Sequence, residues 1–149
     1  MATDAAIEIC EAVKDALNNG GYSHTFTAAR AYNLTAELED DDGITHVDVA
    51  VREEEGAIAS RDDTAEEIGI DIVVRAKCDV SDTSILDAYM GLLKQFLGTF
   101  IATRVETATH GDAWCHGWER SPAYFQDHIQ KYRQFTGLLT LRFSIALDI

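Results

Sequence analysis

Residues 135–149 read FTGLLTLRFSIALDI, and from Leu139 onward large apolar side chains alternate with smaller or polar ones. A period of two places successive side chains on opposite faces of a β-strand. The residues that share the apolar face are Leu139, Leu141, Phe143, Ile145 and Leu147. The pattern therefore predicts a long strand with one buried face.

Two earlier segments have the same period. Residues 44–53, ITHVDVAVRE, place three valines at every second position, and residues 68–77, IGIDIVVRAK, do the same with isoleucine and valine. Each segment is typical of a strand that buries one face against a core. The simplest arrangement pairs them as an antiparallel hairpin with an extended tip.

The connection between these strands is long and polar. Residues 52–70 read REEEGAIASRDDTAEEIGI and carry seven acidic side chains. We expect an extended loop at about residues 53–67, and a connection of that length inside one domain usually has a function. The candidate contact residues in it are Glu53, Glu54, Glu55, Ser60, Arg61, Asp62 and Asp63.

Two segments have the 3.6-residue period of amphipathic helices. Residues 4–17 follow Thr3 or Asp4 as a cap and end before Asn-Asn-Gly-Gly, and residues 81–104 open with Ser-Asp-Thr. In the second helix the apolar stripe is Ile85, Tyr89, Leu92, Leu93, Phe96, Leu97 and Phe100. A stripe of this width is expected to pack on a sheet.

The order of elements predicts the fold class. A helix, a short strand within residues 24–32, the hairpin, the long helix and at least two more strands follow one another along 149 residues. No regular alternation of strands and helices calls for a parallel sheet. We therefore expect a single α+β domain over residues 1–149, with a mainly antiparallel sheet, a long β-hairpin arm and two helices packed on one face.

The charge and the termini restrict the partners. Twenty-six acids against twelve lysines and arginines give a net charge of −14, which opposes sequence-independent binding of nucleic acid through phosphate contacts. The acidity is equally consistent with solubility alone. Residues 1–17 lack the basic start and apolar run of a signal or membrane segment, and three separated cysteines fit reduced thiols. We expect synthesis in the cytoplasm and no membrane partner.

Residues 110–118, HGDAWCHGW, contain the richest set of chemically active side chains. His110, Asp112, Cys115 and His116 carry atoms that zinc accepts. Cys115 and His116 are adjacent, however, so on a strand their side chains point to opposite faces. We expect no catalytic residue, metal or cofactor and no enzymatic activity; a metal-dependent enzyme that uses this segment is an alternative.

Trp114 and Trp118 are four residues apart, so on a regular strand they share a face. Two large rings there would either cover the sheet or anchor an interface with another protein. The second interpretation gives another alternative function, a small soluble protein-interaction adaptor.

Several segments together resemble the phage tail terminator or tail completion proteins, also called minor tail or neck proteins. The resemblance spans most of the chain. It rests on the acid-capped first helix, the polar loop with Ser60, Arg61 and Asp62 before IGIDIVV, the helix carrying LLKQFL, and the closing pattern SPAYFQDHIQKYRQFTGLLTLRF.

The resemblance implies a structural virion protein that is made in the host cytoplasm and located in the tail or neck. Such proteins form a homo-oligomeric ring, commonly a hexamer, at the head-proximal end of the tail. The implied partners are the tail tube protein and the connector or neck proteins, and DNA passes through the ring without specific binding. In this interpretation the loop contacts a neighbouring subunit or the tube, and its acids repel the DNA.

Overall fold

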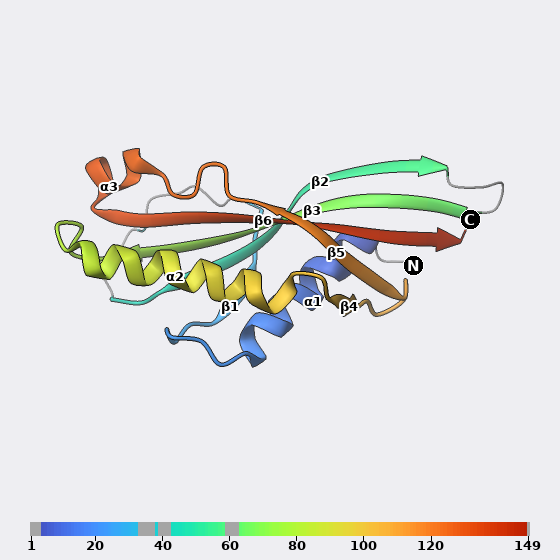
Figure 1. Ribbon diagram of the computed structural model, residues 1–149, viewed down its shortest axis with the longest axis horizontal. Helices are drawn as coiled ribbons and strands as arrows, with labels where there is room; N and C mark the ends of the chain where they lie inside the picture. Colours follow the sequence, from blue (N-terminus) through green and yellow to red (C-terminus); the bar gives the residue numbers. More distant parts are fainter. Residues whose placement is uncertain (1–3, 33–37, 39–42, 59–62, 149) are drawn as a thin grey trace.

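The computed structural model describes residues 4–32, 38, 43–58 and 63–148. The described chain has three helices and a six-stranded, mostly antiparallel sheet, as predicted for the α+β class (Figure 1). The elements are α1 (Ala5–Asn19), β1 (Ala28–Arg30), β2 (His46–Ile58), β3 (Asp63–Lys77), α2 (Thr83–Phe100), β4 (Arg104–Glu106), β5 (Asp112–Glu119), α3 (Gln126–Tyr132) and β6 (Gln134–Asp148).

The predicted caps determine where the two long helices begin. Asp4 Oδ1 accepts a hydrogen bond of 2.8 Å from the Ala6 amide at the start of α1, and Asp82 Oδ1 accepts one of 3.0 Å from the Ser84 amide in α2. Each bond satisfies a backbone donor that the first turn leaves without a helical partner. The helix caps predicted at the starts of α1 and α2 are therefore confirmed.

The sheet order is β1-β2-β3-β6-β5-β4, so the C-terminal strand lies in its interior. β6 pairs with β3 along its whole length, from Gln134 opposite Lys77 to Asp148 opposite Asp63. β1 is parallel to β2, and every other pair is antiparallel. The hairpin of β2 and β3 is confirmed, but β6 makes it part of a three-stranded unit.

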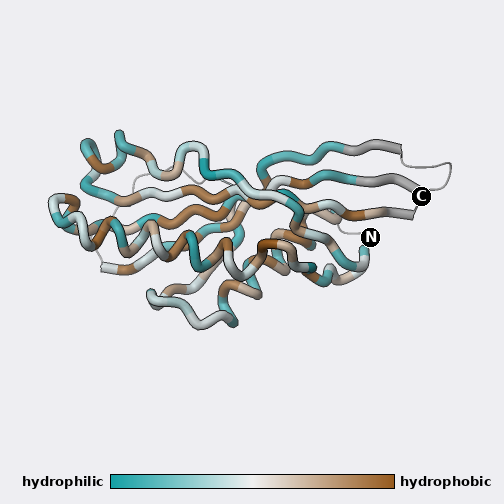
Figure 2. The backbone as a smooth tube through the Cα atoms, viewed as in Figure 1, coloured by the Kyte–Doolittle hydropathy of each residue, from teal (hydrophilic) through white to brown (hydrophobic). Residues whose placement is uncertain are grey.

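The helices α1 and α2 pack on one face of the sheet, as expected (Figure 1). Four α2 side chains are completely or almost completely buried in the core between the helices and the sheet: Leu92, Leu93, Phe96 and Phe100. Each such side chain contributes about 1.5–3 kcal/mol by leaving water. Figure 2 shows that hydrophobic residues gather where helices and sheet meet. We call this face of the sheet the helix face and the opposite one the outer face.

A third helix, α3, was not predicted and lies on the outer face near the N-terminal end of β6. His128 Nδ1 is 2.7 Å from Thr136 Oγ1, and the Phe125 amide donates to the Thr136 carbonyl at 2.8 Å. The helix ends at Arg133, whose φ of 49° is left-handed. It covers the part of that face where Gln134 and Thr136 are completely buried.

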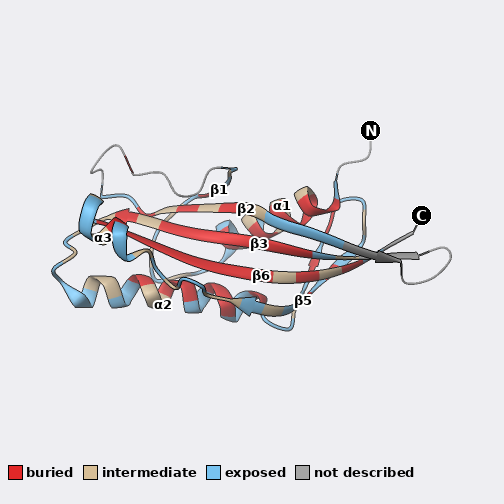
Figure 3. Ribbon diagram, turned by 90° about the horizontal axis from the view of Figure 1, so that it is seen from above, coloured by how far each residue is buried: buried red, intermediate tan, exposed pale blue. Residues whose placement is uncertain are grey.

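At the other end of the sheet, β2, β3 and β6 project past both long helices (Figures 1 and 3). We call this projection the arm: residues 53–58 of β2, 63–68 of β3 and 143–148 of β6. The extended loop expected at about residues 53–67 is therefore wrong for most of its length, because strands occupy 53–58 and 63–67. Pairing with β6 supplies the partner that the sequence pattern could not indicate.

Candidate interaction surface

The acids at the base of the arm alternate between the two faces, and a β-bulge decides which face each one takes. The register shifts between Val51 and Glu53, so that Glu53 lies opposite Gly69, Glu54 opposite Ile68 and Glu55 opposite Glu67. Glu53 and Glu55 consequently lie on the outer face, and Glu54 lies on the helix face. Regular alternation from Val51, which is half-buried against the core, would have given the reverse.

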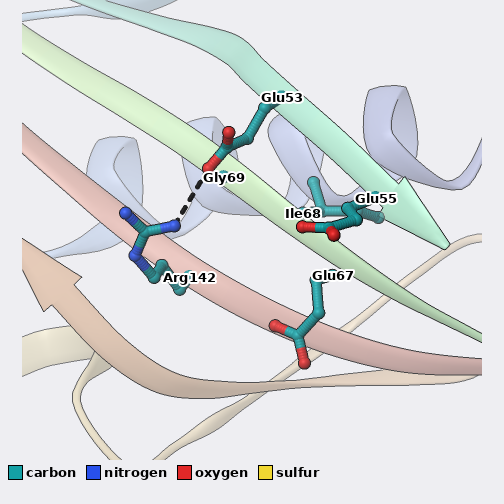
Figure 4. Close-up of a pocket in the computed structure, with 6 residues that line it drawn as sticks. All are labelled: Glu53, Glu55, Glu67, Ile68, Gly69 and Arg142. Carbon is teal, nitrogen blue, oxygen red and sulfur yellow. Dashed lines mark hydrogen bonds and ion pairs between the residues drawn. The ribbon is translucent and has the colours of Figure 1, made fainter. Parts of the chain in front are cut away.

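Gly69 allows the Glu53 side chain to cross the neighbouring strand. A Cβ at Gly69 would lie 3.1 Å from Glu53 Cγ, closer than ordinary contact. With no side chain there, Glu53 Oε1 reaches Arg142 on β6 at 2.9 Å, as Figure 4 shows. The close approach explains why glycine occupies this position of β3.

Arg142 joins three strands on the outer face. Besides Glu53 of β2, its guanidinium contacts Glu119 of β5, with Nη2 to Oε2 at 2.7 Å. Glu53, Glu55, Glu67 and Arg142 line a shallow depression of about 110 Å³ together with Ile68 and Gly69 (Figure 4). One arginine of β6 thus bridges carboxylates of β2 and β5, in ion pairs whose side chains are 40–53% exposed.

Further ion pairs continue across the outer face. Arg75 Nη2 is 2.6 Å from Asp48 Oδ2, and His116 Nε2 is 2.5 Å from Glu67 Oε2. Asp71 accepts a hydrogen bond of 2.6 Å from Thr140 Oγ1. The side chains of Arg75 and Asp48 are only 13% and 15% exposed, whereas those of His116 and Glu67 are 39% and 55% exposed. The charged groups open to water or to a polar partner are therefore those nearest the arm.

Glu54 belongs to a different cluster, on the helix face beside the start of α1. Its hydrogen bond with Asp4, together with desolvation and repulsion from Asp4 and Glu66, raises the pKa of Glu54 to about 7. Two carboxylates that share a hydrogen bond favour the protonated form of one of them. Any cation brought close to Glu54 would reverse that effect.

Trp114 and Trp118 lie on opposite faces, so the prediction that they share one is wrong. A second bulge, between Cys115 and Gly117, shifts the register, so that Trp114 is opposite Ser144 and Trp118 opposite Leu141. Their residues are 42% and 43% exposed, so neither ring is a core residue. Both line a groove of about 440 Å³ at the free edge of β5.

Each tryptophan ring is covered by one cation. Lys94 Nζ of α2 is 5.3 Å from the Trp118 ring centroid on the helix face, and Arg104 Cζ of β4 is 5.0 Å from that of Trp114 on the outer face. Within the described residues neither cation belongs to an ion pair. Both cations are therefore available to an acidic partner at this edge.

The candidate zinc ligands of residues 110–118 point in different directions. His110 Nδ1 contacts Glu8 of α1 at 3.0 Å, Cys115 is buried, and His116 contacts Glu67 on the outer face. Burial raises the pKa of the Cys115 thiol. No group of three or more His, Cys, Asp or Glu side chains suited to a metal occurs among the residues that the structure describes.

The remaining predicted contact residues are only partly covered by the structure. Ser60, Arg61 and Asp62 lie outside the described residues, as does the side chain of Asp63. Sequence reasoning missed Arg142, Gly69, Lys94 and Arg104. The one usable signal was the polar position of Arg142 within an alternating strand, because the other three depend on register and on neighbouring elements.

Comparison with known proteins adds no relative. A scan against protein-family models gives no match, and a search of curated proteins gives no significant one. None of the described helices is long and apolar enough to cross a membrane. The features that can indicate a function are therefore the α+β fold, the arm and the edge of β5.

Proposed function

We propose that this protein is a structural virion component of a tailed phage or prophage, a ring at the head-proximal end of the tail. The ring ends the tail tube and joins it to the neck or connector. The observation that carries the proposal is the arm, a three-stranded projection that extends past the helices and carries Glu53, Glu54 and Glu55 at its base. The sequence resemblance to tail terminator proteins supplies the class and the expectation of six subunits.

The arm supports the proposal because its strand edges are incomplete. Beyond Val49, β2 has a strand neighbour on one side only within the described residues, and β6 pairs with β5 only as far as Ser144. Exposed edges of this kind promote association, and native proteins usually cover them. Contact with a neighbouring subunit or with the tube protein would cover them here.

The charge of the surface supports a passive role toward DNA. Glu53, Glu55 and Glu67 lie together on the outer face of the arm, on a chain with a net charge of −14. If this face lines the channel, the duplex meets like charge and slides without specific binding. A charge of this sign is the opposite of the basic surface found on DNA-binding domains.

The test is the solution mass by light scattering over a range of protein and salt concentrations, with negative-stain images of any large species. A closed ring with a central hole is expected. A chain that stays monomeric in every condition would overturn self-assembly into a ring. That result would favour the second candidate, a small interaction adaptor, for which the exposed Trp114 and Trp118 are the specific observation.

Deletion of residues 54–63 tests the arm itself. The variant shortens β2 and β3 and removes the contact of Glu54 with Asp4, but it leaves the hydrophobic core under α1 and α2 in place, so thermal unfolding should remain cooperative. We expect loss of the ring in light scattering. Normal assembly of the shortened chain would argue against an assembly role for the arm.

A further inference from the structure

We propose that the free edge of β5, bounded by Trp114 and Trp118, binds the Glu53–Glu55 edge of β2 from a second copy of this chain. This contact rests on the proposed ring and specifies how neighbouring subunits join. It is heterologous, because two different edges meet, and heterologous contacts close into rings when the rotation between copies allows it.

The two edges are open in the described structure. β4 covers β5 only where Arg104–Glu106 pair with Asp112–Trp114. One residue further along β5, the Thr103 carbonyl accepts a hydrogen bond of 2.9 Å from the Cys115 amide. From His116 onward that side of β5 has no strand neighbour among the described residues. The groove of about 440 Å³ lies along this edge, where an added strand would be seated.

The strand directions suit such a contact. β2 is antiparallel to β3, β3 to β6, and β6 to β5, so β2 and β5 run in opposite directions. When neighbouring copies continue the sheet with the same face outward, β2 of one copy is therefore antiparallel to β5 of the next. An antiparallel junction is the more stable kind of strand pairing.

The charges on each face also match. Glu53 and Glu55 on the outer face would meet the side that carries Arg104 over Trp114, and Glu54 on the helix face would meet the side that carries Lys94 over Trp118. The bulge before Glu53 gives the acids this order. The contact should stabilise the charged form of Glu54 most, because a cation from the neighbour offsets the repulsion of its carboxylate by Asp4 and Glu66.

A second copy is preferred to an unrelated partner for a specific reason. The acidic edge and the cationic edge occur on the same chain, at opposite sides of one sheet, and each presents charges on both faces. Complementary charges of this kind determine register and exclude wrong pairings. An unrelated partner that bound one edge would leave the complementary edge of this chain without a partner.

The experiment uses the full chain with charge-reversing substitutions on each edge. Arg104→Glu and Lys94→Glu should each weaken association by at least about tenfold in light scattering, because like charges then face one another. Glu55→Lys should do the same from the other edge. Lys131→Glu, an equal charge change at an exposed site on α3, is the matched control and should assemble as the wild type does.

Mixing the variants makes the test specific. Chains with Glu55→Lys and chains with Arg104→Glu should assemble only weakly alone but form rings as wild-type chains do when mixed in equal amounts, since each edge then meets an opposite charge. Rings of the single variants that are as stable as wild-type rings, or a mixture that fails to recover, would overturn this contact while leaving the ring intact. A wild-type chain that never assembles would overturn the ring and the contact together.

Discussion

Substitution of Gly137 by alanine tests how closely α2 packs on the centre of the sheet. An added Cβ would lie 2.5 Å from Leu93 Cδ1 and 2.8 Å from Phe135 Cε1, well inside the usual contact distance of about 3.5–4.0 Å. Both neighbouring side chains are buried, so they have little room to move. The substitution therefore forces either α2 or the aromatic ring of Phe135 to shift.

The magnitude follows from two opposing effects. Overpacking of a filled core costs about 1–3 kcal/mol. Replacing glycine by alanine within a regular element contributes about 0.5–1 kcal/mol in the opposite direction. The net expectation is a free energy of unfolding lower by roughly 0–2.5 kcal/mol. Tm should fall by about 2–4 °C per kcal/mol in a chain of this size.

Urea unfolding followed by circular dichroism measures this change, and α2 supplies the controls. Gly91 and Gly98 lie inside α2, and a Cβ at either position meets nothing within 4 Å. Alanine there should stabilise the protein by about 0.5–1 kcal/mol. If Gly137→Ala were as stable as Gly98→Ala, the reasoning on helix and sheet contact would be refuted.

Three further outcomes are expected. Because the folded pKa of Glu54 is raised from 4.5 to about 7, wild-type Tm should decline as pH rises through that window, and Glu54→Gln should remove much of the decline. The hydrogen bond from Thr109 lowers the pKa of Glu8, so Glu8→Gln should lower Tm at neutral pH. The difference in Tm between variant and wild type should shrink in acid, as the wild-type carboxylate is protonated, and an equal difference in acid would contradict this. Iodide quenching of the fluorescence of Trp114 and Trp118, measured separately in single Trp→Phe variants, should fall as the protein assembles. Unchanged quenching would place the two indole side chains outside the subunit contact.

The strands of the core were predictable because one face of each is buried. The period of two in residues 44–53, 68–77 and 139–147 reports that burial directly, and the stripe of α2 does the same at the helical period. The arm was not predictable in this way. Both of its faces carry polar side chains at the base, so Glu53–Glu55 read as a loop although they are paired in strands.

The bulges explain why the candidate surface was only partly predicted. One extra residue in β2 and one in β5 change the face of every side chain beyond them, which reverses Glu53 to Glu55 and separates Trp114 from Trp118. Local sequence carries no reliable signal for such an insertion. The short helix α3 was missed for another reason, since its seven residues give less than two full periods of apolar spacing.

The interior position of β6 has a consequence for how the protein folds. The strand that joins β3 to β5 follows every other described element in the chain, so the sheet has no centre until residues 134–148 have left the ribosome. Before that moment the inner edges of β3 and β5 are both exposed to other chains. Pairings between segments so distant in sequence form slowly, and rapid synthesis at high concentration should therefore favour aggregation over folding.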